Sequence, residues 1–73
     1  MKLPIVSGMK IVKMLTKYGF EIKGRKGSHV TLEKGEFRVT VPLHNEIGYG
    51  LLIDIIKQSG YKREEFLKII KKS

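Results

Sequence analysis

His29 is the residue of this sequence best suited to chemistry. It lies among basic residues in a segment where apolar and polar residues alternate, a pattern that predicts the open, polar face of a strand. An imidazole near neutral pH can take or give a proton during phosphodiester cleavage, and neighbouring Lys and Arg can stabilise charge that develops on phosphorus. A histidine that is simply exposed on a strand is the alternative interpretation. His44 stands beside Asn45 in a predicted loop, where a turn-stabilising role is favoured.

Other familiar arrangements of catalytic residues are missing from the sequence. The chain contains no Cys, which excludes a thiolate nucleophile, a disulfide and a zinc–cysteine site. No glycine-rich phosphate loop, Ser-His-Asp spacing or carboxylate cluster is present, and two His alone make a poor metal site. We therefore expect a domain without metal or cofactor.

The charge of the chain predicts a polyanionic partner. Fifteen Lys and Arg against seven Asp and Glu give a net charge of +8 on 73 residues. The excess is concentrated in residues 1–42, which hold nine basic and three acidic side chains. Such a field favours nucleic acid, an anionic membrane surface or an acidic protein. A basic surface that only improves solubility is the alternative.

Hydrophobic spacing predicts the helices. Apolar residues recur at helical spacing between Ser7, a favourable N-cap, and Gly19, a stop signal. A second helix is expected over Gly50–Ser59. A third is expected over Arg63–Lys72, with acidic residues in its first turn and basic residues in its last, as the helix dipole favours.

Alternation with period two predicts three short strands over residues 20–25, 29–33 and 37–41. A three-residue turn over residues 25–27 would place Lys23 opposite His29, and a two-residue turn over residues 34–35 would place His29 opposite Thr40. Helices should cover the apolar face of the sheet. The open face should then carry Lys23, Arg25, His29, Thr31, Arg38 and Thr40.

These elements predict one α+β domain over residues 1–73, with the order α-β-β-β-α and a short C-terminal helix. The three-stranded sheet should be antiparallel, with its helices on one face. The longest apolar run, Leu51-Leu52-Ile53, is far shorter than the roughly 20 residues of a membrane span, and the first residues do not resemble a signal peptide. A cytoplasmic protein without membrane contact is expected.

Several short motifs resemble those of the HicA (YcfA-like) toxin family. They are Gly19-Phe20, Gly27-Ser28-His29, Val39-Thr40-Val41-Pro42 with His44, and Gly50-Leu51-Leu52 followed by Ile55 and Gly60. The resemblance implies a fold like the double-stranded RNA-binding domain, a toxin of a type II toxin–antitoxin module that cleaves mRNA, and His29 as its catalytic residue. It also implies a HicB-like antitoxin as partner. The sequence departs from the family at Leu51 and Lys62, where the family usually has a capping Ser or Thr.

The leading hypothesis is thus a metal-independent endoribonuclease that acts on mRNA. His29 would assist attack of a ribose 2′-hydroxyl on the adjacent phosphorus, leaving a cyclic phosphate, a route that DNA lacks. The proton donor is left open between Lys23, Ser28 and water. The residues expected to contact RNA are Lys23, Arg25, Lys26, Ser28 and Arg38. An RNA-binding module without catalysis and a basic module that binds an acidic protein are the alternatives.

Overall fold

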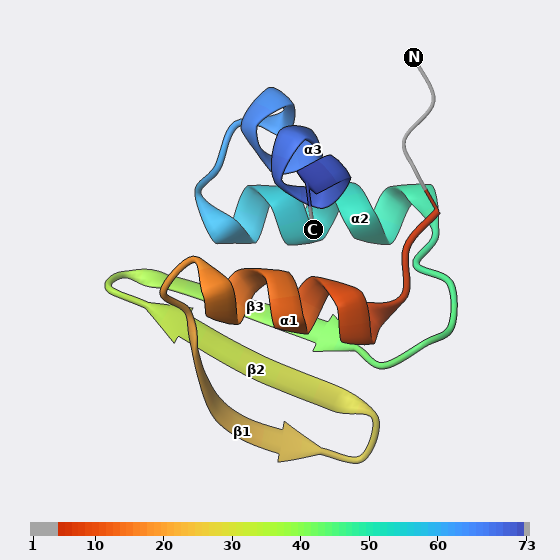
Figure 1. Ribbon diagram of the computed structural model, residues 1–73. Coiled ribbons are helices and arrows are strands. Elements are labelled where there is room, and N and C mark those ends of the chain that lie inside the picture. Colours follow the sequence, from red (N-terminus) through yellow and green to blue (C-terminus); the bar gives the residue numbers. More distant parts are fainter. Residues whose placement is uncertain (1–4, 73) are drawn as a thin grey trace.

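The computed structural model describes residues 5–72 and confirms the predicted α+β order (Figure 1). The elements are α1 (Gly8–Lys17), β1 (Glu21–Lys26), β2 (His29–Lys34), β3 (Phe37–Pro42), α2 (Tyr49–Ser59) and α3 (Arg63–Lys72). The strands form one antiparallel sheet in the order β1-β2-β3. None of the helices in residues 5–72 combines the length and the apolar character of a membrane span.

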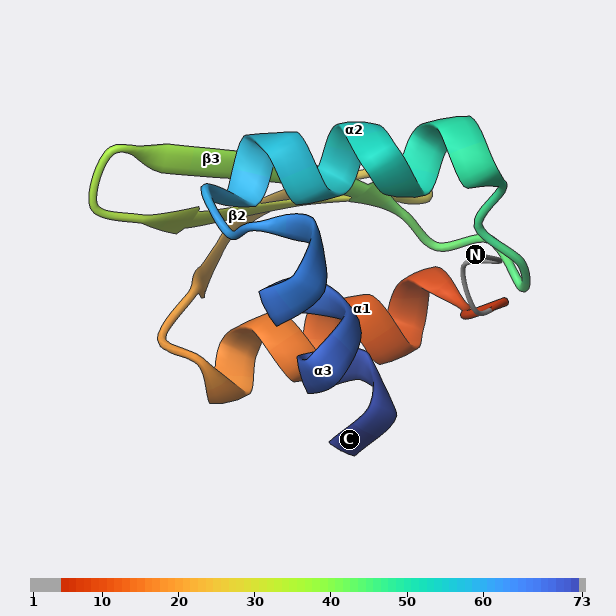
Figure 2. The ribbon, with the colours of Figure 1, turned by 90° about the horizontal axis from the view of Figure 1, so that it is seen from above.

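The helices leave one face of the sheet uncovered. Helix α1 packs across the other face, α2 runs along the outer edge of β3, and α3 lies beside α1 and α2 (Figures 1 and 2). The Gln58 side-chain oxygen of α2 accepts a hydrogen bond of 3.1 Å from the Thr40 backbone N–H. Since Thr40 belongs to the edge strand β3, this bond satisfies a donor that a sheet edge would otherwise expose.

The core lies between α1, α3, α2 and the inner face of β2 and β3. Its largest fully buried side chain is Phe66 of α3, which belongs to the same apolar cluster as the sheet residues Leu32 and Val39. These two strand residues are direct cross-strand partners, as are Val30 and Val41. The predicted alternation is confirmed for Val30 and Leu32 of β2 and for Val39 and Val41 of β3, which are buried. At the ends of β3 it fails, because Phe37 is exposed and Pro42 is buried.

Local capping fixes where the helices begin and end. The Ser7 side-chain oxygen accepts from the Lys10 N–H at 3.2 Å, which confirms the predicted N-cap of α1. Helix α3 begins after Lys62. The Lys62 backbone N–H donates a hydrogen bond of 3.1 Å to the Glu65 carboxylate. Glu65 thus supplies one half of a capping box although Lys62 has no hydroxyl.

Both predicted strand registers are wrong. The turns are two residues long, with Lys26 opposite His29 across the first and Lys34 opposite Phe37 across the second. Gly27 and Gly35 occupy the first turn position with φ of 60° and 58°, and no other residue type in the described chain has positive φ. A glycine at the first position is the type II′ pattern, which matches the twist of a hairpin.

Strand β1 differs from the prediction of one buried apolar face. All six of its residues are exposed, including Ile22, because β1 extends beyond α1 (Figure 1). Its pairing with β2 shifts by one residue between Ile22 and Gly24, which identifies a bulge at Lys23. Residues of β1 after the bulge therefore point to the face opposite to the one that simple alternation predicts.

Candidate nucleic-acid interface

His29 is the first residue of the central strand, directly after the tight turn at Gly27. Its cross-strand partners are Lys26 on β1 and Pro42 on β3. The imidazole is exposed, and its neighbour Val30 is buried on the helix side. Since successive strand residues point to opposite faces, His29 lies on the open face of the sheet. This confirms the predicted placement of His29 on a solvent-facing strand surface.

The bulge and the two-residue turn place Lys26, and not Arg25, on the face of His29. Lys26 pairs directly with His29, so both side chains lie on the open face. Arg25 pairs with the buried Val30 and therefore lies on the helix side of β1, where its Nε donates to the Gly27 carbonyl oxygen at 3.2 Å. The expectation that Arg25 shares a face with His29 is wrong because the bulge adds one residue to β1.

Arg38 lies on the open face as predicted, but its charge is paired. It is the cross-strand partner of Glu33, and the Arg38 Nε lies 3.2 Å from the Glu33 carboxylate. Arg38 is also four residues along β3 from Pro42, the partner of His29, which corresponds to about 13 Å in an extended strand. Of the basic residues predicted to contact RNA, Lys26 is therefore closer to His29 than Arg38.

The other two expected contact residues flank these positions. Lys23 is exposed at the bulge and is not the partner of His29, so the predicted Lys23–His29 pair is absent from the described sheet. Ser28 is exposed in the turn immediately before His29. The Ser28 carbonyl oxygen accepts a 2.6 Å hydrogen bond from the Leu43 N–H, which ties the turn to the end of β3.

A contact that the sequence did not reveal holds this end of the sheet. Gly8, the first residue of α1, is buried against the Pro42 carbonyl oxygen so closely that any Cβ would clash with it. The Gly8 N–H donates to the His44 carbonyl oxygen at 2.9 Å. A glycine directly after an N-cap serine was the only available signal. The start of α1 therefore fixes the chain that follows Pro42, the cross-strand partner of His29.

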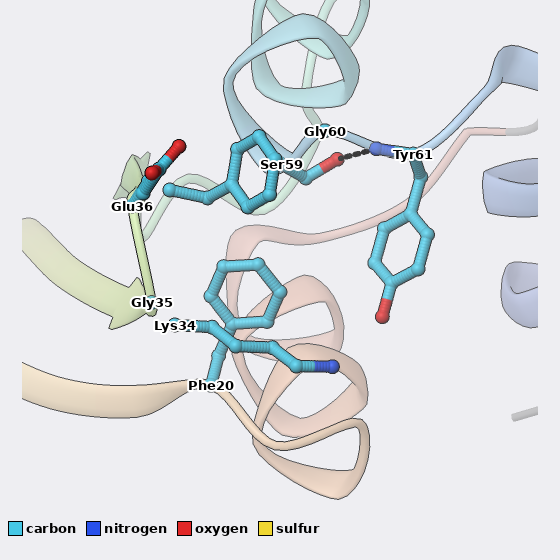
Figure 3. Close-up of a pocket in the computed structure, with 8 residues that line it drawn as sticks. Phe20, Lys34, Gly35, Glu36, Ser59, Gly60 and Tyr61 are labelled. Carbon is cyan, nitrogen blue, oxygen red and sulfur yellow. Dashed lines mark hydrogen bonds between the residues drawn. The ribbon is translucent and has the colours of Figure 1, made fainter.

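An apolar pocket of about 350 Å³ lies at the other end of β2 (Figure 3). It is lined by Phe20, Lys34, Gly35, Glu36, Phe37, Ser59, Gly60 and Tyr61. The Lys34 amine donates a hydrogen bond of 2.7 Å to the Tyr18 carbonyl oxygen and lies over the Phe20 ring. Because His29 and Lys34 are at opposite ends of β2, they are about 17 Å apart along the strand. The pocket is therefore separate from the His29 surface.

The open face carries a group that can transfer protons and a group that can bind anions. Among residues 5–72, no group of three or more His, Cys, Asp or Glu side chains could hold a metal ion. The face instead combines one exposed imidazole with an adjacent lysine, and Arg38 lies farther along the same face. Such a surface can bind phosphates and exchange protons at a nearby phosphodiester.

A comparison with known protein families shows the family of this chain. The family model described as HicA toxin of bacterial toxin–antitoxin matches residues 8–61, which is well over half of the chain. This protein belongs to the HicA toxin family. The match confirms the resemblance seen in the sequence motifs. It runs from the start of α1 through Tyr61, so it includes His29 and His44, whereas α3 lies beyond it. No curated protein and no solved structure matches the chain.

Proposed function

We propose that this HicA-family protein is a metal-independent endoribonuclease that cleaves mRNA and uses His29 as its catalytic base. The observation that carries the proposal is the pairing of His29 with Lys26 on an uncovered sheet face. There an imidazole and an ammonium group are presented together to solvent. Membership of a toxin family gives this chemistry a biological purpose, because degradation of mRNA would stop growth.

The proposed reaction uses the ribose as its own nucleophile. His29 takes the proton from a 2′-hydroxyl while the 2′-oxygen attacks the adjacent phosphorus, and the bond from phosphorus to the 5′-oxygen breaks. The products are a 2′,3′-cyclic phosphate and a free 5′-hydroxyl. Lys26 binds the phosphate and stabilises the negative charge that develops on its oxygens, since both side chains lie on the same face.

A toxin also requires a partner that silences it. The family is defined by toxin–antitoxin modules, and we infer a HicB-like antitoxin for this chain, with both proteins acting in the cytoplasm. The net charge of +8 favours an antitoxin with an acidic surface. Binding over His29 and Lys26 would block the RNA and the imidazole in a single contact.

The proposal is tested with purified protein and three oligonucleotides of one sequence: RNA, 2′-O-methyl RNA and DNA. We expect cleavage of the RNA alone, with a cyclic phosphate on the new 3′ end, and binding without cleavage for the 2′-O-methyl RNA. Cleavage of either substrate that lacks a free 2′-hydroxyl would contradict the mechanism. Binding of all three without any cleavage would favour a non-catalytic RNA-binding module.

A further inference from the structure

One backbone hydrogen bond ties the loop after β3 to the turn before His29. The Leu43 N–H donates to the Ser28 carbonyl oxygen at 2.6 Å, one residue past the pair formed by His29 and Pro42. His44 is the next residue, two positions from Pro42. His44 lies just outside β3, which ends at Pro42, and the bond between Leu43 and Ser28 holds it near the start of β2. The two imidazoles of the chain therefore belong to the same end of the sheet.

The side chain of His44 is exposed at the end of the sheet that carries His29. Leu43 packs against the apolar core, whereas His44 is exposed. The residue after Leu43 therefore faces solvent. Within residues 5–72, neither His29 nor His44 makes a side-chain hydrogen bond, which leaves both rings able to contact a substrate.

The backbone of His44 is fixed more firmly than its position in a loop suggests. Its carbonyl oxygen accepts from the Gly8 N–H at 2.9 Å, and three residues later the Ile47 N–H donates to the Val6 carbonyl oxygen at 2.8 Å. Both bonds anchor the loop to the segment that begins α1. Among residues 5–72 the imidazole of His44 makes none of the hydrogen bonds that hold this turn, which differs from the turn-stabilising role favoured by the sequence.

We propose that His44 is a second catalytic residue, the acid that protonates the leaving 5′-oxygen. This inference rests on the proposed ribonuclease function. One imidazole cannot act as base and acid in the same step, whereas two can divide the roles. His29 accepts the 2′-hydroxyl proton, and the protonated His44 gives its proton to the 5′-oxygen as the bond to phosphorus breaks. His29 ends protonated and His44 neutral, and exchange with water restores both.

A substrate with a sulfur leaving group separates this role from a structural one. In an RNA whose scissile 5′-oxygen is replaced by sulfur, the leaving thiolate needs no proton from an acid. We expect the His44→Ala variant to cleave ordinary RNA about 10²-fold or more slowly than the unaltered protein, since this is the usual contribution of a general acid. The same variant should cleave the sulfur substrate nearly as fast as the unaltered protein. His29→Ala should be slow on both substrates, because each still requires a base.

The matched control is Asn45→Ala, which changes the next exposed residue of the same loop and should leave both rates unchanged. Equal slowing of His44→Ala on the two substrates would overturn the inference by showing that His44 positions the RNA or the loop. Cleavage of ordinary RNA by His44→Ala at the unaltered rate would overturn it too. In both cases the proposed function would stand. If the unaltered protein cleaved neither substrate, the proposed function would fail, and the inference with it.

Discussion

Lys26 and His29 face each other across the two-residue turn that joins β1 to β2. They are separated by only two residues in sequence, and the turn brings them together as direct partners on the open face. The pair places a flexible cation next to the imidazole, where the phosphate of a bound RNA would lie. Arg25, although adjacent in sequence, lies on the other side of the strand.

This geometry predicts unequal roles for two neighbouring cations. In a His29→Ala background, which prevents cleavage, Lys26→Ala should weaken RNA binding more than Arg25→Ala. The salt dependence of binding should also become shallower by about 0.7 in the log–log slope, the value for one lost phosphate contact to a single strand. Fluorescence titrations at several salt concentrations measure both quantities. Lys68→Ala on α3 is the control for charge alone, and an equal effect of all three substitutions would contradict the local contact.

The ion pair between Glu33 and Arg38 predicts opposite effects of two substitutions on one face. Glu33→Gln should strengthen RNA binding, because it releases the Arg38 guanidinium 3.2 Å away and removes a negative charge. Arg38→Gln should weaken binding only slightly, since its charge is already partly balanced. Both side chains are substantially exposed, so the pair contributes at most about 1 kcal/mol to folding. Unchanged affinity for Glu33→Gln would indicate that RNA does not reach this part of the sheet.

The close contact of Gly8 with Pro42 predicts a loss of stability on adding one methyl group. In Gly8→Ala the new Cβ would clash with the Pro42 carbonyl oxygen, which is backbone and cannot rotate away. We expect the free energy of unfolding to fall by about 1–3 kcal/mol, as for other overpacked sites. Thermal unfolding measures the change. Gly50→Ala is the control, since nothing lies within 4 Å of its Cβ position and alanine favours the helix.

The chemistry of the described residues predicts that activity survives metal removal. No group of three or more His, Cys, Asp or Glu side chains in residues 5–72 could hold a metal ion, and the proposed reaction needs only proton transfer and cations. RNA cleavage should therefore continue at an unchanged rate in EDTA. A rate that falls in EDTA and returns on addition of Mg²⁺ would contradict this mechanism.

The sequence predicted the elements better than their pairing. Ser7 and the spacing of apolar residues located α1, and the charges of Arg63–Lys72 defined α3 with the observed bounds. The β2–β3 register failed by two residues, a shift that alternation permits, and the β1–β2 register failed by three at His29 because of the bulge at Lys23. Turn geometry is the remaining local signal for the pairing. Gly27 and Gly35 at the first turn position did carry that signal, since glycine there is typical of the type II′ turn.

The sequence identified His29 as the central residue of the candidate site, but it did not predict which side chains surround it. The exposure of His29 followed from its place in an alternating strand. The bulge at Lys23 did not, because its only trace is an adjacent glycine, and it reverses the faces of Arg25 and Lys26. The contact of Gly8 with Pro42 joins residues far apart in the chain. No local pattern records such a contact.

The most direct test of the central claim is the rate of RNA cleavage by His29→Ala. The side chain is exposed and makes no hydrogen bond within the described residues, so the thermal stability of the variant should match that of the unaltered protein within about 0.5 kcal/mol. We predict that this folded variant still binds RNA but cleaves it at least about 10²-fold more slowly. Cleavage by folded His29→Ala at the unaltered rate would contradict the account.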